Sequence, residues 1–250
     1  MTILVGMMCT DGIVLGADSS STFSAGNTPT IEQPTRKLHV VGNSVLLAGT
    51  GSVGLNQRFH AIVQDHYDRK VFAQKEPMEC AKSLCAAAIS DFGSTSATRG
   101  TYGALVAFCH GNKPYLVEFG VTDFQPEFKD ENIWYVSMGS GQVIADPFLG
   151  LMRSAFYPAG PPTLSMGVFV AAWALAHTIE VNPGGIKEPL RLAVIRKTDG
   201  HMKACELTGD ELIEHNASIE AAKQYLSAYA DRFDTPDAPE VPEPPALPAK

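Results

Sequence analysis

Short apolar runs separated by turn residues mark the N-terminal part of the chain, and this pattern predicts β-hairpins. The first pair of apolar runs covers residues 2–9 and 13–18. The second pair covers residues 37–41 and 44–48. The turns between them are Asp11-Gly12 and Gly42-Asn43. Such pairs between apolar runs are strong hairpin signals. We therefore expect two antiparallel hairpins in this part of the chain.

Further along, apolar residues recur at helical spacing in several stretches. We expect helices at residues 52–67, 76–92, 141–156, 163–177 and 209–232. Between them we expect strands at residues 102–108, 114–119, 133–137, 190–196 and 202–206. Strands follow strands and most helices come in pairs, so the order differs from βαβ alternation. The pattern predicts an α+β domain in which antiparallel sheets are covered by helix pairs.

The C-terminal end has a different composition from the rest. Residues 235–250 contain six prolines and three acidic residues with almost no large apolar side chain. Such a segment cannot bury enough apolar surface to fold. We expect a single folded domain over residues 1–233 and a Pro/acid-rich tail over 234–250. The tail is interpreted as solubilising, with a docking or gating role as the alternative.

Composition and charge narrow the classes of function. Hydrophobic residues make up 45% of the chain and the net charge is −8. Binding to a nucleic-acid backbone needs clustered Lys and Arg, so we expect no nucleic-acid partner. The longest apolar run, Val168–Ala176, is shorter than the roughly 20 residues that span a bilayer. We expect no membrane segment, no secretory signal and a cytoplasmic location.

Cysteine and histidine usage predicts neither a disulfide framework nor a metal site. The five cysteines are Cys9, Cys80, Cys85, Cys109 and Cys205, all within apolar, periodic segments. Their number is odd and no C-x-x-C motif occurs, which favours free core thiols in a reducing compartment. The histidines form no H-x-x-x-H pair. We therefore expect no metal and no cofactor.

Residues Gly49–Gly54 match the G-x-G-x-x-G pattern of dinucleotide-binding loops. That function requires a βαβ unit, with an acidic residue roughly 20 positions further on. After the expected helix at 52–67, residues 68–76 are too polar and too few for a buried parallel strand. The pattern is therefore interpreted as a glycine-rich strand-to-helix turn with another role.

The N-terminus offers a nucleophile. Thr2 follows the initiator methionine and is small enough for Met1 removal to be expected. Removal would leave Thr2 with a free α-amine, whose ordinary pKa of about 7.7–8.0 lets it act as a base near neutral pH. A threonine hydroxyl is a weak nucleophile until such a base activates it. One residue would thus carry both nucleophile and base.

Hairpin geometry brings polar neighbours to Thr2. If Asp11-Gly12 is a two-residue turn, Thr2 lies opposite Ser21, and residues 19–22 line the same end of the sheet. A buried Asp18 would need a cation or hydrogen-bond donors, and Lys37 begins the next hairpin. An Asp18–Lys37 pair beside Thr2 would disfavour the protonated amine and favour loss of the threonine proton.

The segments "TILVGMMCTDGIVLGADSSST" and "RKLHVVGNSVLLAGTG" resemble the β-type subunits of the proteasome. The resemblance covers about residues 2–230. The spacing matches from Thr2 to Asp18 and again from Lys37 to Gly51, with a longer loop at about residues 25–35 between them. It implies an N-terminal-nucleophile hydrolase with a four-layer αββα sandwich. It also implies that the Gly51 N–H serves an oxyanion hole and that Ser140, in "SMGSG", supports Thr2.

One motif departs from the family pattern. Where catalytic subunits have an aspartate and, three residues later, a serine before Gly-Gly, this chain has "HTIEVNPGG". Glu180 can still accept hydrogen bonds, whereas Pro183 has neither a hydroxyl nor an N–H. This departure keeps open a catalytically weak or inactive structural ring subunit. A different N-terminal-nucleophile amidase acting on a small amide is the remaining alternative.

The resemblance implies a threonine-type endopeptidase that acts within a homo-oligomeric ring, expected as a double ring. Its substrate would be a peptide or unfolded protein, and an ATP-dependent unfoldase is a further candidate partner. We expect substrate contacts from Ser21, Thr22, Gly49 and Thr50, with Gly49 leaving a roomy side-chain pocket. Among bacterial types, the bacterial proteasome homologue fits better than HslV or Anbu, because threonine follows Met1 directly and the chain is longer than HslV.

Overall fold

The computed structural model describes residues 1–25, 28–95, 100–182 and 184–234. The chain divides into two compact units, Met1–Leu207 and Thr208–Lys250. The first unit contains strands β1–β12 and helices α1–α5, and the second contains helix α6 (Gly209–Asp234). The single domain expected over 1–233 stays a prediction, and all but the first residue of the expected tail lies outside the described residues.

Two five-stranded antiparallel sheets form the centre of the first unit. One has the order β10-β1-β2-β11-β12 and the other β5-β6-β7-β8-β9. The strands of the first sheet are β1 (Leu4–Cys9), β2 (Gly12–Ala17), β10 (Tyr135–Met138), β11 (Arg191–Thr198) and β12 (His201–Glu206). Those of the second are β5 (Leu38–Val41), β6 (Val45–Gly51), β7 (Tyr102–His110), β8 (Lys113–Phe119) and β9 (Pro126–Phe128).

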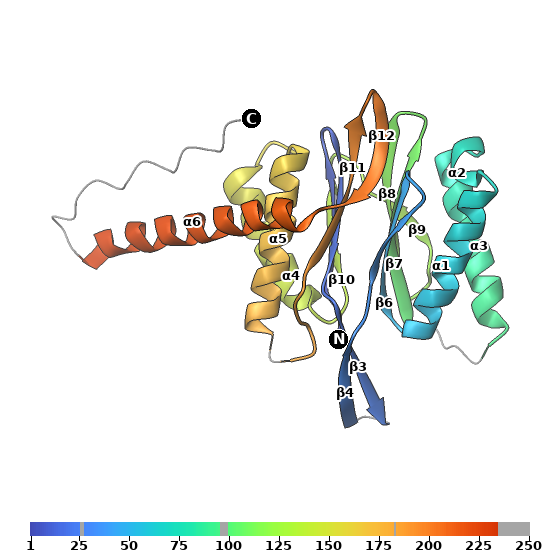
Figure 1. Cartoon of the computed structure of the whole chain (residues 1–250), viewed down its shortest axis with the longest axis horizontal. Helices are drawn as coiled ribbons and strands as arrows, with labels where there is room; N and C mark the ends of the chain where they lie inside the picture. Colours follow the sequence, from blue (N-terminus) through green and yellow to red (C-terminus); the bar gives the residue numbers. More distant parts are fainter. Residues whose placement is uncertain (26–27, 96–99, 183, 235–250) are drawn as a thin grey trace. The chain divides into compact units, whose positions relative to one another are not determined.

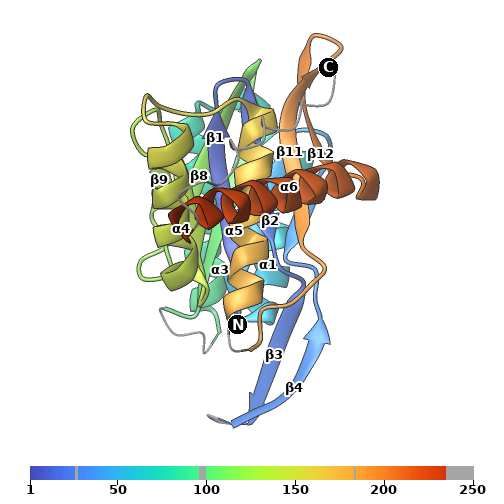
Figure 2. The ribbon, with the colours of Figure 1, turned by 90° about the vertical axis from the view of Figure 1, so that its left-hand side faces the viewer.

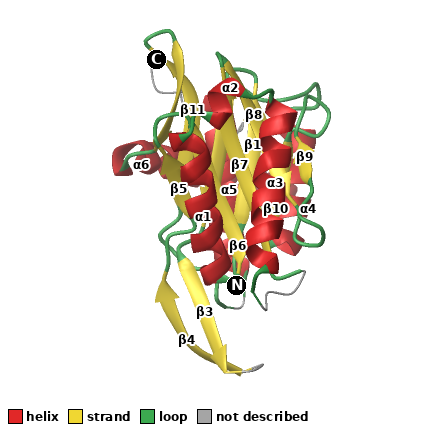
Figure 3. Cartoon of the chain, turned by 90° about the vertical axis from the view of Figure 1, so that its right-hand side faces the viewer, coloured by secondary structure: helices red, strands yellow, loops and turns green. Residues whose placement is uncertain are grey.

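Helices cover the outer face of each sheet (Figure 1). On the β5–β9 sheet lie α1 (Val53–Asp68), α2 (Val71–Gln74) and α3 (Pro77–Gly93), with α1 and α3 side by side in Figure 3. On the other sheet lie α4 (Gln142–Phe156) and α5 (Leu164–Val181). The result is the predicted four-layer αββα sandwich of two antiparallel sheets. The β6–α1 turn joins an antiparallel strand to a helix, so the G-x-G-x-x-G pattern is not part of a βαβ unit.

Strand alternation decides which side chains fill the space between the sheets. Side chains at every second position point to the same face. Leu4, Leu15, Leu46 and Leu105 belong to one buried cluster between the sheets. Because Thr2 is two positions before Leu4, it continues the row that faces the other sheet. The strand pattern therefore directs the candidate nucleophile toward the end of the gap between the sheets.

Helix α5 is long and apolar enough to pass a length-and-composition test for a membrane span. In the structure it is a core helix, because Leu175 lies against Gly16 of β2 and Leu164 lies against Gly12. A side chain at Gly16 would approach Leu175 to 2.6 Å, so the glycine permits the helix to approach the sheet closely.

The β1–β2 hairpin differs from the predicted register. Leu4 pairs with Ala17 rather than Ser19, and the turn residues are Thr10 and Asp11. Gly12 belongs to strand β2, where a Cβ would lie 2.4 Å from the Ile195 carbonyl oxygen. The glycine therefore serves the close approach of β11 rather than the turn. The prediction that Thr2 lies opposite Ser21 was wrong by two positions.

A two-stranded ribbon replaces the loop expected at about residues 25–35. Strand β3 (Ser20–Ala25) pairs with β4 (Thr28–Pro34) in a separate antiparallel sheet. In Figure 2 the ribbon extends away from the sandwich below the N-terminus. Short elements α2 and β9 were also not predicted. The other expected helices and strands are present, with small differences at their ends.

The five cysteines are free thiols, as predicted, and four of them are buried. Burial raises the pKa of Cys9 and of Cys80 to about 12. These thiols therefore stay protonated and have the low reactivity of core cysteines.

A stacked histidine pair on β5 and α1 predicts a pH-dependent stability. The rings of His39 and His60 are 4.4 Å apart between centroids. Burial, followed by His60 and Arg36, lowers the pKa of His39 to about 4, while Glu206 opposes the shift. The unfolded chain, in which this pKa is about 6.5, therefore binds about one more proton between these values. The free energy of unfolding should fall as the pH drops from about 6.5 to 4.

Urea unfolding at several pH values tests this contribution. The variant His39→Gln should show a shallower pH dependence, by about one proton, than the wild type. Exposed His201→Gln serves as the control and should keep the wild-type slope. Some slope should remain in His39→Gln, because burial also lowers the pKa of His60 and His66. Equal slopes in all three proteins would contradict the assignment.

Candidate active site

Thr2 is clamped by the loop between β10 and α4. Its backbone N–H donates to Ser140 Oγ at 3.1 Å, and its carbonyl accepts from the Gly141 N–H at 3.1 Å. Thr2 is 7% exposed. The predicted neighbour Ser140 therefore contacts Thr2 directly, although 138 residues separate them in the chain.

Gly139 lets this loop fit between the two sheets. Its φ is +98°, a value that favours glycine. A Cβ at this position would lie 2.3 Å from the Thr2 carbonyl oxygen and 3.1 Å from Thr50 Oγ1. The backbone of Gly139 thus lies against Thr2 at the end of one sheet and Thr50 at the end of the other. This contact brings the two sheet ends together at the site.

Asp18 anchors the start of both sheets. The residue is fully buried, directly after β2. Its Oδ1 accepts from the Ile3 N–H at 3.0 Å and its Oδ2 from the Ser20 N–H at 3.1 Å. Lys37 Nζ is 2.8 Å from both carboxylate oxygens. The predicted ion pair is therefore present, and Asp18 also fixes the backbone at Ile3, directly after the candidate nucleophile, and at Ser20.

Lys37 also reaches the peptide bond that precedes Thr2. Its Nζ donates to the Met1 carbonyl oxygen at 2.9 Å, and Thr2 Oγ1 donates to the same oxygen at 2.8 Å. Burial lowers the pKa of the Lys37 ammonium, and Asp18 opposes this shift. The site therefore binds a peptide carbonyl oxygen between the hydroxyl of Thr2 and the cation of Lys37.

Met1 is present in this structure, so the Thr2 nitrogen is an amide and cannot act as a base. Removal of Met1 would convert that nitrogen, 3.1 Å from Ser140 Oγ, into an amine. The amine of Met1 itself has a pKa lowered by burial and by Lys37. An amine at Thr2 would meet the same cation, which favours its neutral form.

Gly51 ends strand β6 with its N–H directed to the open side of the sheet. The Gly49 N–H donates to the Lys37 carbonyl, on the β5 side of β6, at 3.1 Å. The Ser52 N–H donates to the Thr101 carbonyl, on the β7 side. N–H groups two residues apart on a strand point to the same side. The Gly51 N–H therefore points to the side of Lys37, beyond the first residue of β5. Its φ of +101° and a Thr101 oxygen 2.1 Å from a hypothetical Cβ both require glycine.

The predicted substrate-contact residues have different surroundings. Ser21 is buried, and Thr22 Oγ1 accepts from the Met1 amine at 3.5 Å. Gly49 does not leave a roomy pocket, because Asn56 Oδ1 lies 2.0 Å from the position of a Cβ there. Tyr102 donates to that Asn56 oxygen at 3.0 Å. Sequence reasoning missed Asn56, whose only signal was a polar residue one turn into α1.

The "HTIEVNPGG" segment is divided between two environments. Glu180 is exposed in the last turn of α5 and lies on nearly the opposite helix face from Thr178, which contacts Gly141. Its role at the site stays a prediction, and Pro183 lies outside the described residues. Gly185 does reach the N-terminus, because a Cβ there would lie 2.8 Å from Thr22 Oγ1 and 2.6 Å from Met1 Cε.

Within the described ranges, His, Cys, Asp and Glu side chains form no group of three that could hold a metal ion. The chemistry of the site is instead that of a hydroxyl, a buried ammonium and backbone N–H groups around one carbonyl oxygen.

Comparisons with known proteins give one family match and related folds. The family model described as "Proteasome subunit" matches residues 2–153. A mutant of Anbu from Hyphomicrobium sp. strain MC1 is similar in structure, with a TM-score of 0.66, 15% identity, and coverage of 91% of this chain and 97% of the other. Anbu from the same organism has a TM-score of 0.64, 14% identity, and coverage of 90% and 97%. Among curated proteins, none matches this sequence.

Breaking the Asp18–Lys37 pair should cost much more stability than breaking an exposed pair. Asp18→Asn leaves a buried ammonium without its counterion, so the free energy of unfolding should fall by about 3–5 kcal/mol. The control is Asp65→Asn, which breaks the exposed pair with Arg69 and should cost less than about 1 kcal/mol. Urea denaturation measures both.

The double variant Asp18→Asn/Lys37→Met separates the pair from its surroundings. It removes both charges, so its free energy of unfolding should fall by less than the sum of the decreases in the two single variants. Strictly additive losses would show that the two side chains do not interact in solution.

Gly51→Ala and Gly54→Ala form a matched test of the strand-to-helix turn. Gly51→Ala should lower the free energy of unfolding by more than about 1 kcal/mol because of its positive φ and the Thr101 oxygen. At Gly54 the nearest atom is 3.9 Å from the new Cβ, so alanine should stabilise α1 by up to about 1 kcal/mol. Thermal unfolding of both variants measures these changes. A Gly51→Ala protein as stable as the wild type would refute the assigned strain.

Proposed function

The chain belongs to the proteasome subunit family, and from that membership we propose that it is a threonine-type endopeptidase with Thr2 as its nucleophile. Family membership supports a hydrolase. The observation that carries the finer proposal is the Met1 carbonyl oxygen, which accepts hydrogen bonds from Thr2 Oγ1 and Lys37 Nζ. A substrate carbonyl oxygen held in the same way would lie beside the Thr2 hydroxyl and the Lys37 cation.

The reaction proceeds by acyl transfer once Met1 has been removed. Thr2 Oγ attacks the substrate carbonyl carbon, and the α-amine of Thr2 takes the hydroxyl proton. The amine then returns the proton to the leaving nitrogen as the C–N bond breaks, which leaves an ester on Thr2. Water, deprotonated by the same amine, attacks the ester carbonyl. As the ester C–O bond breaks, the protonated amine returns this proton to Thr2 Oγ, which releases the acid and restores the hydroxyl.

Electrostatic interactions assist this acyl transfer. Lys37, held by Asp18, keeps a positive charge next to the amine and the hydroxyl, which favours the neutral amine and loss of the threonine proton. The Gly51 N–H, directed to the side of Lys37, stabilises the oxyanion of the tetrahedral intermediate. One such donor contributes about 3 kcal/mol. Ser140 orients the Thr2 nitrogen.

We propose that the substrate is a peptide or unfolded protein and that copies of the chain assemble into a ring, with an ATP-dependent unfoldase as a further partner. The family match supports the assembly, because subunits of this family generally act in rings. The free buried thiols support a reducing cytoplasmic location.

The second candidate function is a ring subunit with little or no hydrolytic activity. The exposed position of Glu180 favours it, since Glu180 stands where the family has an aspartate and lies on nearly the opposite helix face from Thr178, which contacts Gly141. This candidate and the peptidase predict the same fold and assembly, so only a measurement of turnover separates them.

Thr2→Ala tests the nucleophile. Turnover of fluorogenic peptides should fall at least a thousandfold, because the covalent step is lost. Thr10→Ala, at the exposed far end of β1, is the matched control and should keep wild-type turnover. Intact mass should show that Met1 is absent from the active wild type. Equal turnover in wild type and Thr2→Ala, or a wild type that is active with Met1 retained, would overturn the proposal.

A further inference from the structure

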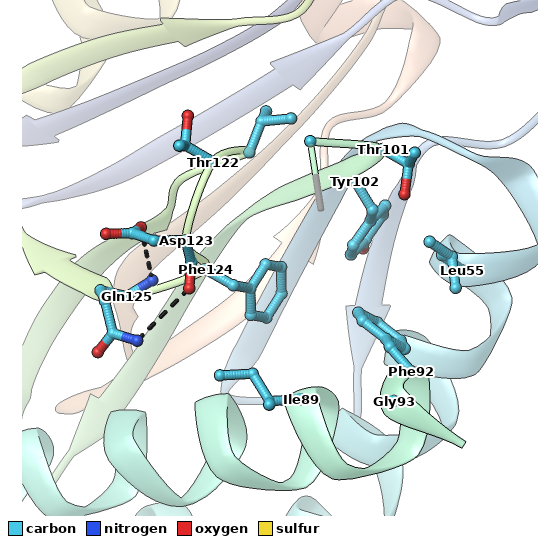
Figure 4. A pocket seen from close by; sticks show the side chains of 12 residues that line it. Leu55, Ile89, Phe92, Gly93, Thr101, Tyr102, Thr122, Asp123, Phe124 and Gln125 are labelled. Atoms are coloured by element: carbon cyan, nitrogen blue, oxygen red, sulfur yellow. Dashed lines mark hydrogen bonds between the residues drawn. The ribbon is translucent and has the colours of Figure 1, made fainter. Parts of the chain in front are cut away.

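A cavity of about 560 Å³, whose described lining does not include Thr2, lies between the ends of α1 and α3, the start of β7 and the loop that joins β8 to β9. Figure 4 shows three aromatic rings, those of Phe92, Tyr102 and Phe124, gathered at its wall. Each ring is 5.8 Å from the other two, measured between centroids. The volume falls in the range of about 300–1,000 Å³ that is typical of small-molecule sites.

The lining selects the chemistry of a ligand. Apolar side chains of Leu55, Ile89 and Val121 join the three rings, and Asp123 is the only charged residue among the described lining residues. In Figure 4 the polar Asp123 and Gln125 lie together on one side, and the Gln125 N–H donates to Asp123 Oδ1 at 3.1 Å. Among the described lining residues the one charge is the negative charge of Asp123, which disfavours an anion, and the rings favour an aromatic ligand.

The wall of the cavity includes a strained turn. Phe124 has a φ of +59°, which is unusual for a bulky residue. Two hydrogen bonds stabilise the turn. The Phe124 N–H donates to the Gly120 carbonyl at 3.0 Å, and Cys85 Sγ donates to the Phe124 carbonyl at 3.2 Å. Residues held in such conformations cluster at ligand sites.

The opposite wall supports the glycine turn of the active site. The Thr101 carbonyl accepts from the Ser52 N–H at 2.9 Å and lies against Gly51. Tyr102, paired with Gly51 in the sheet, donates to Asn56, which lies against Gly49. An occupant that contacts Thr101 and Tyr102 therefore contacts the groups that hold residues 49–52 in place.

We propose that this cavity binds a small neutral aromatic molecule and that its occupant alters the backbone at Gly51. The consequence for hydrolysis rests on the proposed function; the binding and the backbone change do not. Such an effect is a coupling between two sites, because the ligand and the Gly51 turn share Thr101 and Tyr102 as contacts.

Binding is tested with the neutral fluorophore N-phenyl-1-naphthylamine on the full chain. The wild type should bind it with saturation at one site per chain, and the anionic 8-anilino-1-naphthalenesulfonate at least tenfold more weakly. Ile89→Trp puts a larger side chain on the cavity lining and should weaken binding at least tenfold. Met78→Trp is the matched control, since Met78 lies on the same helix with 46% exposure against 48% for Ile89. The proposed site is wrong if the wild type does not bind the neutral fluorophore, or if Ile89→Trp does not weaken its binding more than Met78→Trp does.

Coupling is tested by amide hydrogen exchange of peptides that cover residues 45–55. Saturation with the fluorophore should change their exchange rate at least twofold in wild type and Met78→Trp, but not in Ile89→Trp. Unchanged exchange in the occupied wild type overturns the coupling. Because this readout needs no turnover, failure of the peptidase proposal, seen as equal activity of wild type and Thr2→Ala, is distinguishable from failure here.

Discussion

The buried pair of Asp18 and Lys37 is the interaction on which the candidate site depends. A charged carboxylate without water is stable only with a counterion and hydrogen-bond donors, and Asp18 has all of these in Lys37 and the N–H groups of Ile3 and Ser20. The same contacts set where three segments meet: the N-terminus, the start of β3, and the residue before β5. The position of Thr2 is thus a consequence of satisfying one buried charge.

Close backbone approach is the second constraint, and glycine meets it at both ends of the site. Gly139 lies against the Thr2 carbonyl, and Gly51 lies against the Thr101 carbonyl, each with a positive φ. A side chain at Gly139 would push its loop away from Thr2 and Thr50, and one at Gly51 would push the end of β6 away from Thr101. The glycine-rich turn that resembles a phosphate loop therefore has the same physical basis, a backbone N–H left open to an anion. The anion in the proposed reaction is an oxyanion.

The fold and the site differed in how far the sequence could predict them. Short apolar runs separated by turn residues predicted the strands, and the order of elements predicted the helix pairs that cover the sheets. The register of the β1–β2 hairpin was predicted wrongly, because Gly12 was assigned to the turn although the approach of β11 requires it in the strand. Strand β4 was missed because its exposed, proline-containing sequence lacks alternation. Asn56 was missed because nothing local indicates that it fills the space beside Gly49.

By itself, the sequence determined the residue types that make the chemistry plausible: Thr2 next to a removable methionine, one acid and one lysine at hairpin ends, and a glycine-rich turn. These follow from local patterns and short spacings. Only the tertiary structure decided that Ser140 contacts Thr2, that Lys37 reaches the Met1 carbonyl, and that Glu180 stays exposed. The reason is physical: such contacts join segments far apart in the chain, and their distances depend on how the two sheets pack, which no local pattern specifies.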